Sequence, residues 1–177
     1  MSGSLRHHPS AHGREGMRWC APSAAPGDAP IGHFNLHGRE LTPHGMDLSV
    51  VILSYNTRDL LEQALRTVLE AAAGIAAEIF VVDNASRDGS ADMVAERFPE
   101  VRVIRNERNL GFAAGNNVAL RQVRGRYILL LNSDTIVRQD TLSCLLSFLE
   151  AHPEAGAAGC KILNPDGSLQ LSCRRGF

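Results

Sequence analysis

The sequence predicts an α/β fold in which a mostly parallel sheet is flanked by helices. Short apolar runs alternate with stretches of helical periodicity, which is typical of βαβ units joined by right-handed crossovers. The apolar runs lack polar alternation, as expected for strands that are buried on both faces. Polar side chains directly follow four of these runs. Because parallel strands end at one edge of their sheet, we expect these side chains to line a single crevice.

The predicted elements follow one another closely from residue 48 onward. Asp59, with Glu62 three residues later, resembles a capping box that opens the first helix, and Gly74 is expected to end it. The sequence Asn-Pro-Asp-Gly at residues 164–167 predicts a tight turn. In order, the predicted strands cover residues 48–53, 78–83, 101–104, 127–131 and 157–163, and the three later helices cover residues 90–98, 112–123 and 141–151.

Composition places the chain among ordinary globular proteins. Its 177 residues suit one domain, and a formal net charge of -1 argues against a nucleic-acid partner that is bound through bulk positive charge. The cysteines lie far apart without a C-x-x-C pair, which favours neither a zinc site nor a disulfide framework and fits a reducing, cytoplasmic location. The sequence has neither a stretch of the ~18 apolar residues that span a bilayer nor the apolar core of a signal peptide.

Residues 1–46 differ from residues 47–177 in composition and in hydrophobic pattern. They are dense in Gly, Pro, Ser and His, and their few apolar residues have no period, so we expect a disordered N-terminal extension before a single folded domain. Six of the seven histidines lie in this segment. A metal-binding tail is the alternative interpretation, but the histidine spacing is irregular and no Cys or carboxylate pattern accompanies it. A third interpretation is that translation starts at Met46.

Four polar motifs fall at the same position in successive βα units. They are Ser54-Tyr55-Asn56 after the first strand, Asp83-Asn84-Ala85-Ser86 after the second, residues 106–111 after the third and Asn132-Ser133-Asp134 after the fourth. Turn chemistry alone would place similar polarity at the opposite edge of the sheet. The junctions there, residues 73–77 and 124–126, are less distinctive. Together the motifs predict a ligand site at the carboxyl edge.

Each motif has a functional and a structural interpretation. Asp83 is suited to accept hydrogen bonds from a nucleobase or ribose, or else it caps the turn at residues 86–89. Tyr55 is suited to stack on a base, or else it packs at the sheet edge. Gly111 and Gly115 allow a backbone to approach closely at a helix N-terminus that attracts a diphosphate, although Gly115 could serve only helix–sheet packing.

The Asn132-Ser133-Asp134 motif favours a hard cation. Mg²⁺ or Mn²⁺ takes oxygen ligands, typically one or two carboxylates, with substrate phosphates completing the shell. Such a cation would offset the charge that builds up on a departing nucleoside diphosphate. The alternative is that Asp134 only caps the following turn.

Taken together, the four motifs resemble those of the family 2 glycosyltransferases, and most closely the rhamnosyltransferase-like branch. The stretches that carry the resemblance are residues 50–56, 81–90, 109–117 and 129–135. The resemblance implies a GT-A fold and inverting transfer from a UDP- or dTDP-sugar to a glycan or lipid-linked acceptor, with Asp134 as the metal ligand. It implies nucleotide-sugar contacts at Ser54, Tyr55, Asn56, Asp83, Asn109, Gly111, Asn116 and Asn132.

The chain departs from the family pattern in two ways. Ser133 stands where related enzymes commonly have proline. The acceptor-binding half and the general base of the family are expected beyond Phe177, so no catalytic residue is named and we expect donor binding with little or no transfer. One alternative is a non-catalytic nucleotide-sugar-binding fragment. A more remote one is a phospho-receiver module, but that fold needs an acidic cluster at the end of its first strand, and Ser54-Tyr55-Asn56 supplies none. Peripheral membrane association through Arg174 and Arg175 is a further expectation.

Overall fold

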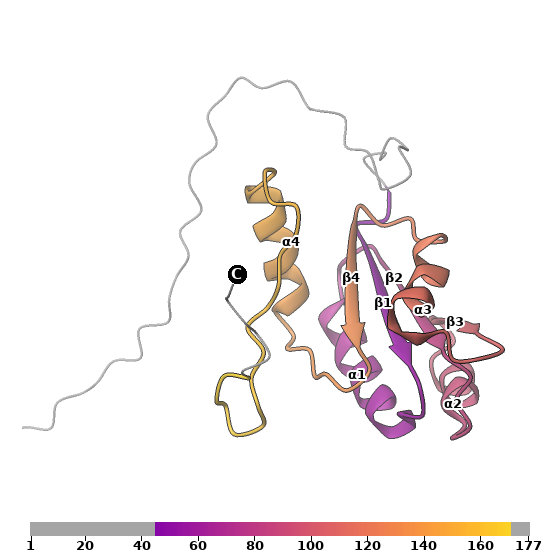
Figure 1. Ribbon diagram of the computed structural model, residues 1–177. Coiled ribbons are helices and arrows are strands. Elements are labelled where there is room, and N and C mark those ends of the chain that lie inside the picture. The colour runs from indigo at the N-terminus through magenta and orange to yellow at the C-terminus, as the bar shows by residue number, and fades with distance from the viewer. Residues whose placement is uncertain (1–44, 171–177) are drawn as a thin grey trace, which may run out of the picture. The chain divides into compact units, whose positions relative to one another are not determined.

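The structure of the protein is a computed structural model that describes residues 45–170 (Figure 1). The expected disordered extension, residues 1–46, lies almost wholly in residues 1–44, which are outside the described part. Arg174 and Arg175 also lie outside it. Strands and helices alternate in the order β1 (Leu48–Ser54), α1 (Arg58–Ala71), β2 (Ala77–Asp83), α2 (Ser90–Arg97), β3 (Arg102–Arg105), α3 (Gly111–Leu120), β4 (Tyr127–Asn132) and α4 (Thr141–Ala151).

The four strands form one parallel sheet in the order β3-β2-β1-β4. This confirms the predicted α/β class. The register brings the strand ends level: Ser54 pairs with Asp83, Leu53 with Asn132, and Asp83 with Arg105. The loops that follow β1, β2, β3 and β4 therefore all leave the sheet from the same edge, as the sequence predicts.

Side chains that alternate along each strand build a core on both faces of the sheet. On one face, Val50 and Ile52 of β1 pack in a cluster with Leu61 and Leu65 of α1 and Val94 of α2. On the other face, a second cluster joins the sheet to α3; its buried members are Val51, Phe80, Val82, Ala119 and Val123. Figure 1 shows β1 and β4 running side by side in the same direction.

Two local predictions are wrong. The first helix begins at Arg58 after Thr57, so Asp59 lies inside its first turn and does not cap it. The N–H of Arg58 is instead bound by the carboxylate of Asp88, from the neighbouring loop, at 2.9 Å. Residues 157–163 form no strand in the described part of the chain, where they are exposed and make only one isolated bridge, Leu163 to Leu169. They lack the neighbouring strand that would supply ladder hydrogen bonds.

The predicted turn at residues 164–167 is confirmed. The N–H of Gly167 donates to the carbonyl of Asn164 at 2.9 Å, and Gly167 has the left-handed backbone, φ 82°, that glycine adopts without strain. Among residues 45–170, no helix combines the length and apolar character needed to cross a membrane.

Candidate functional site

The loops after β1 and β2 are locked together at the carboxyl edge of the sheet. The N–H of Asn56 donates to the Ser86 hydroxyl at 3.0 Å, and the N–H of Arg87 donates to the Asn56 amide oxygen at 2.8 Å. Asn56 and Ala85 have left-handed backbones, φ 55° and 66°, and they are the non-glycine residues with positive φ in the described part of the chain. Side-chain bonds across the two loops thus hold a backbone shape that is rare for residues with a Cβ.

Asp83 lies at the end of β2 and is only 4% exposed. Its Oδ2 accepts the N–H of Ser86 at 3.0 Å, so the expected turn-capping role is real. Its Oδ1 is also buried, and within residues 45–170 it is the one buried side-chain polar atom without a hydrogen-bond partner. A buried acceptor left without a donor costs about 1–3 kcal/mol, more for a charged group. An oxygen kept in that condition at the predicted ligand edge is suited to a donor that comes from outside the chain.

A chain of three hydroxyls connects the β1 loop to the β4 loop. Thr57 donates to Ser133 at 2.9 Å, which leaves Thr57 as the acceptor for the hydroxyl of Ser54, also at 2.9 Å. Ser54 is fully buried and Ser133 is 8% exposed. Ser133 therefore accepts a hydrogen bond that a proline at this position could not accept.

The start of α3 is anchored to the end of β2 by amide side chains. Asn84 accepts a hydrogen bond from the N–H of Leu110 at 3.2 Å and donates to the Asn109 oxygen at 2.9 Å. The Asn109 oxygen in turn accepts the N–H of Gly111 at 2.8 Å. The helix N-terminus expected to be free for an anion therefore already has the N–H groups of Leu110 and Gly111 engaged from within the chain.

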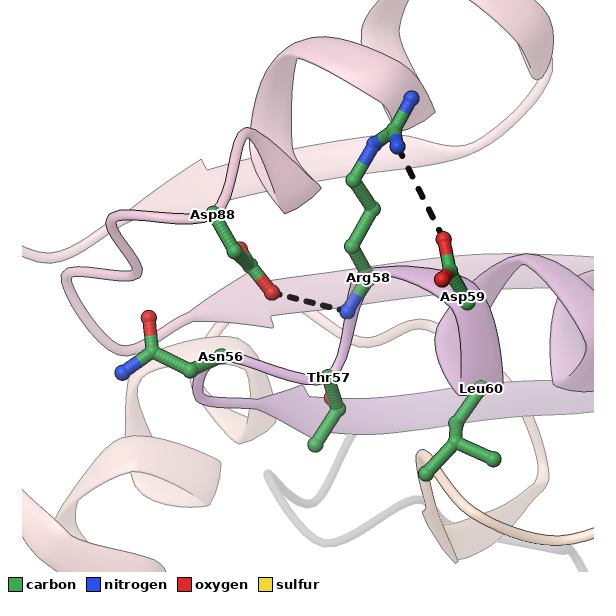
Figure 2. A pocket seen from close by; sticks show the side chains of 6 residues that line it. All are labelled: Asn56, Thr57, Arg58, Asp59, Leu60 and Asp88. Atoms are coloured by element: carbon green, nitrogen blue, oxygen red, sulfur yellow. Dashed lines mark hydrogen bonds and ion pairs between the residues drawn. The ribbon is translucent and has the colours of Figure 1, made fainter.

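Figure 2 shows the pocket beside the α1 N-terminus, which is lined by Asn56, Thr57, Arg58, Asp59, Leu60 and Asp88. Asp88 points across it to the N–H of Arg58, while Asp59 faces the Arg58 guanidinium at 3.7 Å. Burial alone would raise the pKa of Asp88, but hydrogen bonds from Ser90 and from the Arg58 N–H outweigh it and hold that pKa below its usual value. The ionised Asp88 carboxylate thus links the loop after β2 to the start of α1.

Asn132 and Asp134 sit at the end of β4 with exposed side chains. The hydroxyl of Thr135 closes the turn by donating to the Asn132 carbonyl at 2.7 Å, and within residues 45–170 neither side chain has a polar partner. No group of three or more His, Cys, Asp or Glu residues in that range is placed to hold a metal. One exposed carboxylate fits a cation that is shared with phosphate oxygens, but it does not fit a cation held by protein ligands alone.

The structure brings most of the predicted site residues to one edge, but in different roles. Tyr55 is 49% exposed, as a stacking role requires. Ser54 has no exposed surface, so its side chain supports the site from behind and does not contact a ligand. Asn116 is 4% exposed and donates to the Phe112 carbonyl of its own helix at 2.9 Å. Gly115 packs closely against the sheet, because a Cβ there would meet Leu53 Cδ1 at 2.6 Å and the Leu53 side chain would have to shift.

Sequence reasoning assigned no individual role to Thr57, Asn84, Ser86 and Asp88, although Asn84 and Ser86 belong to the motif that follows the second strand. Each has a short polar side chain within a few residues of a strand end, which is the only signal that the sequence offers for them. Their importance arises from hydrogen bonds between loops that are about 25 to 76 residues apart in the chain.

Residues 49–172 match the model of Glycosyl transferase family 2. The chain belongs to this family. Its likeness to the succinoglycan biosynthesis protein ExoO of Rhizobium meliloti is 35% identity over 117 residues, which are 66% of this chain and 32% of ExoO. The chain is 33% identical to the teichuronic acid biosynthesis glycosyltransferase TuaG of Bacillus subtilis over 125 residues, 68% of this chain and 49% of TuaG. It thus spans about a third to a half of these family 2 relatives.

The fold resembles those of solved GT-A glycosyltransferases. The mannosyltransferase PcManGT of Pyrobaculum calidifontis, in complex with GDP-Man and Mn²⁺, superimposes with a TM-score of 0.62 and 29% identity over 71% of this chain and 37% of PcManGT. TarS of S. aureus in complex with UDP-GlcNAc gives a TM-score of 0.55 and 26% identity over 61% of this chain and 32% of that chain. The predicted GT-A fold is therefore confirmed.

Proposed function

We propose that this family 2 chain binds the nucleoside diphosphate of a UDP- or dTDP-sugar along the carboxyl edge of its sheet. In this proposal Asp83 recognises the base, Tyr55 stacks against it, and Asp134 shares a divalent cation with the diphosphate. The bound donor serves inverting transfer of the sugar to a glycan or lipid-linked acceptor. Names of relatives support this class of acceptor, since they act in succinoglycan and teichuronic acid biosynthesis.

The buried Oδ1 of Asp83 is the observation that carries the proposal. Because Oδ2 already accepts the N–H of Ser86, one acceptor remains for a ligand. Uracil and thymine present a single imide N–H between two carbonyls, which matches one acceptor. Guanine presents two adjacent donors and would need both carboxylate oxygens. The geometry supports a pyrimidine base, as does the UDP-GlcNAc complex of TarS, whereas the GDP-Man complex of PcManGT shows that the fold also accepts a purine elsewhere.

The chemistry near Asp134 supports a role for Mg²⁺ or Mn²⁺. The Asp134 carboxylate would ligate the cation, and exposed Asn132 lies two residues before it at the end of β4. The fold neighbour PcManGT was solved with Mn²⁺. When bound, the cation would neutralise charge on the departing nucleoside diphosphate. Asn109 and Gly111 shape the backbone beside the diphosphate and Asn116 steadies the helix behind it.

A cytoplasmic location completes the proposal. Cys144 and Cys160 are free and exposed, which suits a reducing compartment. A role on lipid-linked acceptors would bring the protein to the cytoplasmic face of a membrane.

Isothermal titration of the purified chain with UDP, dTDP and GDP, with and without Mn²⁺, tests the proposal. We expect both pyrimidine nucleotides to bind more tightly than GDP, and Mn²⁺ to tighten UDP binding by about tenfold. Asp134→Asn should abolish the gain in UDP affinity that Mn²⁺ provides (the Mn²⁺ increment) and leave uridine affinity unchanged. Asp47→Asn is the matched control, because Asp47 is exposed at the opposite end of β1. Absence of nucleotide binding, or tighter binding of GDP, would contradict the proposal.

A non-catalytic nucleotide-sugar-binding protein is the second candidate. No residue within 45–170 is assigned as the general base, so binding and transfer are separate questions. Incubating the chain with a UDP-sugar and a glycan acceptor and measuring released UDP distinguishes the two candidates, because only the enzyme releases UDP in proportion to glycan product.

A further inference from the structure

Asn84 is a buried amide at the centre of the carboxyl edge. It follows Asp83 directly at the end of β2 and is 2% exposed, so its side chain does not reach a ligand. Its own N–H donates to the Ser54 carbonyl at 2.8 Å, which fixes its backbone to β1. The side chain is therefore held between two strand ends and points toward the loop that precedes α3.

All four hydrogen-bonding positions of the Asn84 side chain are used. Its oxygen accepts from the Asn106 amide at 2.9 Å and from the N–H of Leu110 at 3.2 Å. Its nitrogen donates to the Asn109 oxygen at 2.9 Å and, more weakly, to the Gly111 carbonyl at 3.4 Å. A side-chain amide has two donors and two acceptor sites, so no capacity is left over. Aspartate has the same shape but could not make either donation.

The partners of Asn84 lie at both ends of the loop that connects β3 to α3. Asn106 begins the loop, and its N–H also donates to the Asp83 carbonyl at 2.9 Å. Leu110 and Gly111 end the loop at the start of α3. A Cβ at Gly115, one turn into α3, would lie 3.3 Å from the Asn84 nitrogen. Asn84 therefore sets both the course of the loop and the position of the first turn of α3.

We infer that Asn84 is a positioning residue that presents residues 109–111 to the diphosphate of the donor. This inference rests on the proposed function and adds a residue that acts through others. Loss of Asn84 would free the loop, because the N–H of Leu110 would lose its acceptor. The Asn109 side chain, whose oxygen accepts from Asn84 and from the N–H of Gly111, would lose the donor that orients it. The base-binding side of the site, Asp83 with Ser86, would keep its own hydrogen bond. The effect should therefore fall on the diphosphate and spare the nucleoside.

The test compares wild type with Asn84→Ala and Asn84→Asp in two measurements. Hydrogen exchange followed by mass spectrometry should show exchange at residues 106–112 accelerated about tenfold or more in both variants, with α1 unchanged. Calorimetry should show UDP affinity in Mn²⁺ lowered about tenfold, while uridine affinity changes by less than about threefold. Gln63→Ala, an exposed amide on α1, is the matched control and should change neither.

The outcomes separate this inference from the proposed function. Equal losses of UDP and uridine affinity would reduce Asn84 to a general structural residue and overturn the inference. Unchanged exchange at residues 106–112 would overturn it as well. A wild-type chain that binds neither UDP nor uridine would refute the proposed function and the diphosphate role together, whatever the exchange data show. Asn84→Asp preserves side-chain volume and both acceptor bonds, so it provides the comparison if Asn84→Ala does not fold.

Discussion

Glu78 and Asp83 are two buried carboxylates at opposite ends of the same strand, β2, and they are treated in opposite ways. Both oxygens of Glu78 are satisfied: Oε1 accepts the Ser49 hydroxyl at 2.7 Å and the Arg124 N–H at 2.6 Å, and Oε2 accepts the Arg124 guanidinium at 3.0 Å. Asp83 keeps one buried oxygen without a partner among residues 45–170. The number of polar residues does not distinguish the two edges of the sheet. The difference is whether the polar atoms are already paired.

The largest expected effect is at the edge of the sheet where Glu78, Ser49 and Arg124 pair their polar atoms, which we call the satisfied edge. A Cβ at Gly125 would lie 2.4 Å from the backbone nitrogen of Ser49 and 2.6 Å from the carbonyl carbon of Leu48, and backbone atoms cannot rotate away. We expect Gly125→Ala to lower the free energy of unfolding by about 3 kcal/mol or more, measured by urea denaturation. Gly156→Ala is the control, because nothing lies within 4 Å of its Cβ. Equal stability of the two variants would mean that this junction is not tightly packed.

Asp83→Asn should have the opposite effect to Gly125→Ala: a large loss of ligand affinity with little loss of stability. The amide oxygen can still accept the Ser86 N–H, which turns the amide nitrogen toward the position of Oδ1 and opposes a donor to the imide N–H of the base. We expect uridine and UDP affinity to fall by about 100-fold in calorimetry, with unfolding free energy changed by less than about 1 kcal/mol. Destabilisation as large as that of Gly125→Ala would show that Asp83 is structural, like Glu78.

Acid should weaken the satisfied edge. Burial alone would raise the pKa of Glu78, but hydrogen bonds from Ser49 and Arg124 outweigh it and leave that pKa below its usual value of 4.5. A lowered folded-state pKa contributes stability that is present above the unfolded pKa and is lost as pH falls through the folded pKa. Glu78→Gln should cost about 1.5 kcal/mol at pH 7 by urea denaturation, and this cost should shrink below pH 4.5.

Exposed Glu100 provides the control for that measurement. Glu100→Gln should leave the stability at pH 7 unchanged. If the cost of Glu78→Gln were the same at pH 7 and at acid pH, the hydrogen bonds to Glu78 would not depend on its charge.

The smallest expected effect concerns the hydroxyl chain of Ser54, Thr57 and Ser133. Thr57 is the N-cap residue of α1 but its hydroxyl makes no capping bond, because it is engaged by the other two hydroxyls. Thr57→Val should lower unfolding free energy by about 1 kcal/mol and weaken the Mn²⁺ increment of UDP binding, since it frees the β4 loop. Ser147→Ala, at an exposed hydroxyl, is the control. An unchanged Mn²⁺ increment would show that Asp134 is positioned without this chain.

Much of the fold follows from sequence, because its cause is local. The apolar run at residues 127–131 and the motif at residues 132–134 predict both β4 and the ligand edge, and α4 begins at Thr141 and ends at Ala151 as its pattern predicts. The satisfied edge could not be predicted in the same way. Residues 124–126 look unremarkable in sequence, and Arg124 is important only because Glu78, which also binds Ser49, accepts its hydrogen bonds after folding.

The candidate site, like the fold, could be predicted only where its cause is local in the sequence. The presence of Asp83 and Asp134 at one edge follows from the parallel sheet. The burial of Ser54, the engagement of the α3 N-terminus by Asn84 and Asn109, and the pairing of Ser133 with Thr57 depend on side-chain contacts between distant loops. No periodicity in the chain carries that information.

The left-handed backbone of Ala85 bears on how the protein could be engineered for heat tolerance. Holding a residue with a Cβ in that conformation costs about 1–2 kcal/mol, which glycine would not incur. Replacement by glycine removes this backbone penalty from the folded chain, but it also enlarges the conformational freedom of the unfolded one. Because the two effects oppose each other, Ala85→Gly should change the melting temperature by less than relief of the backbone penalty alone would.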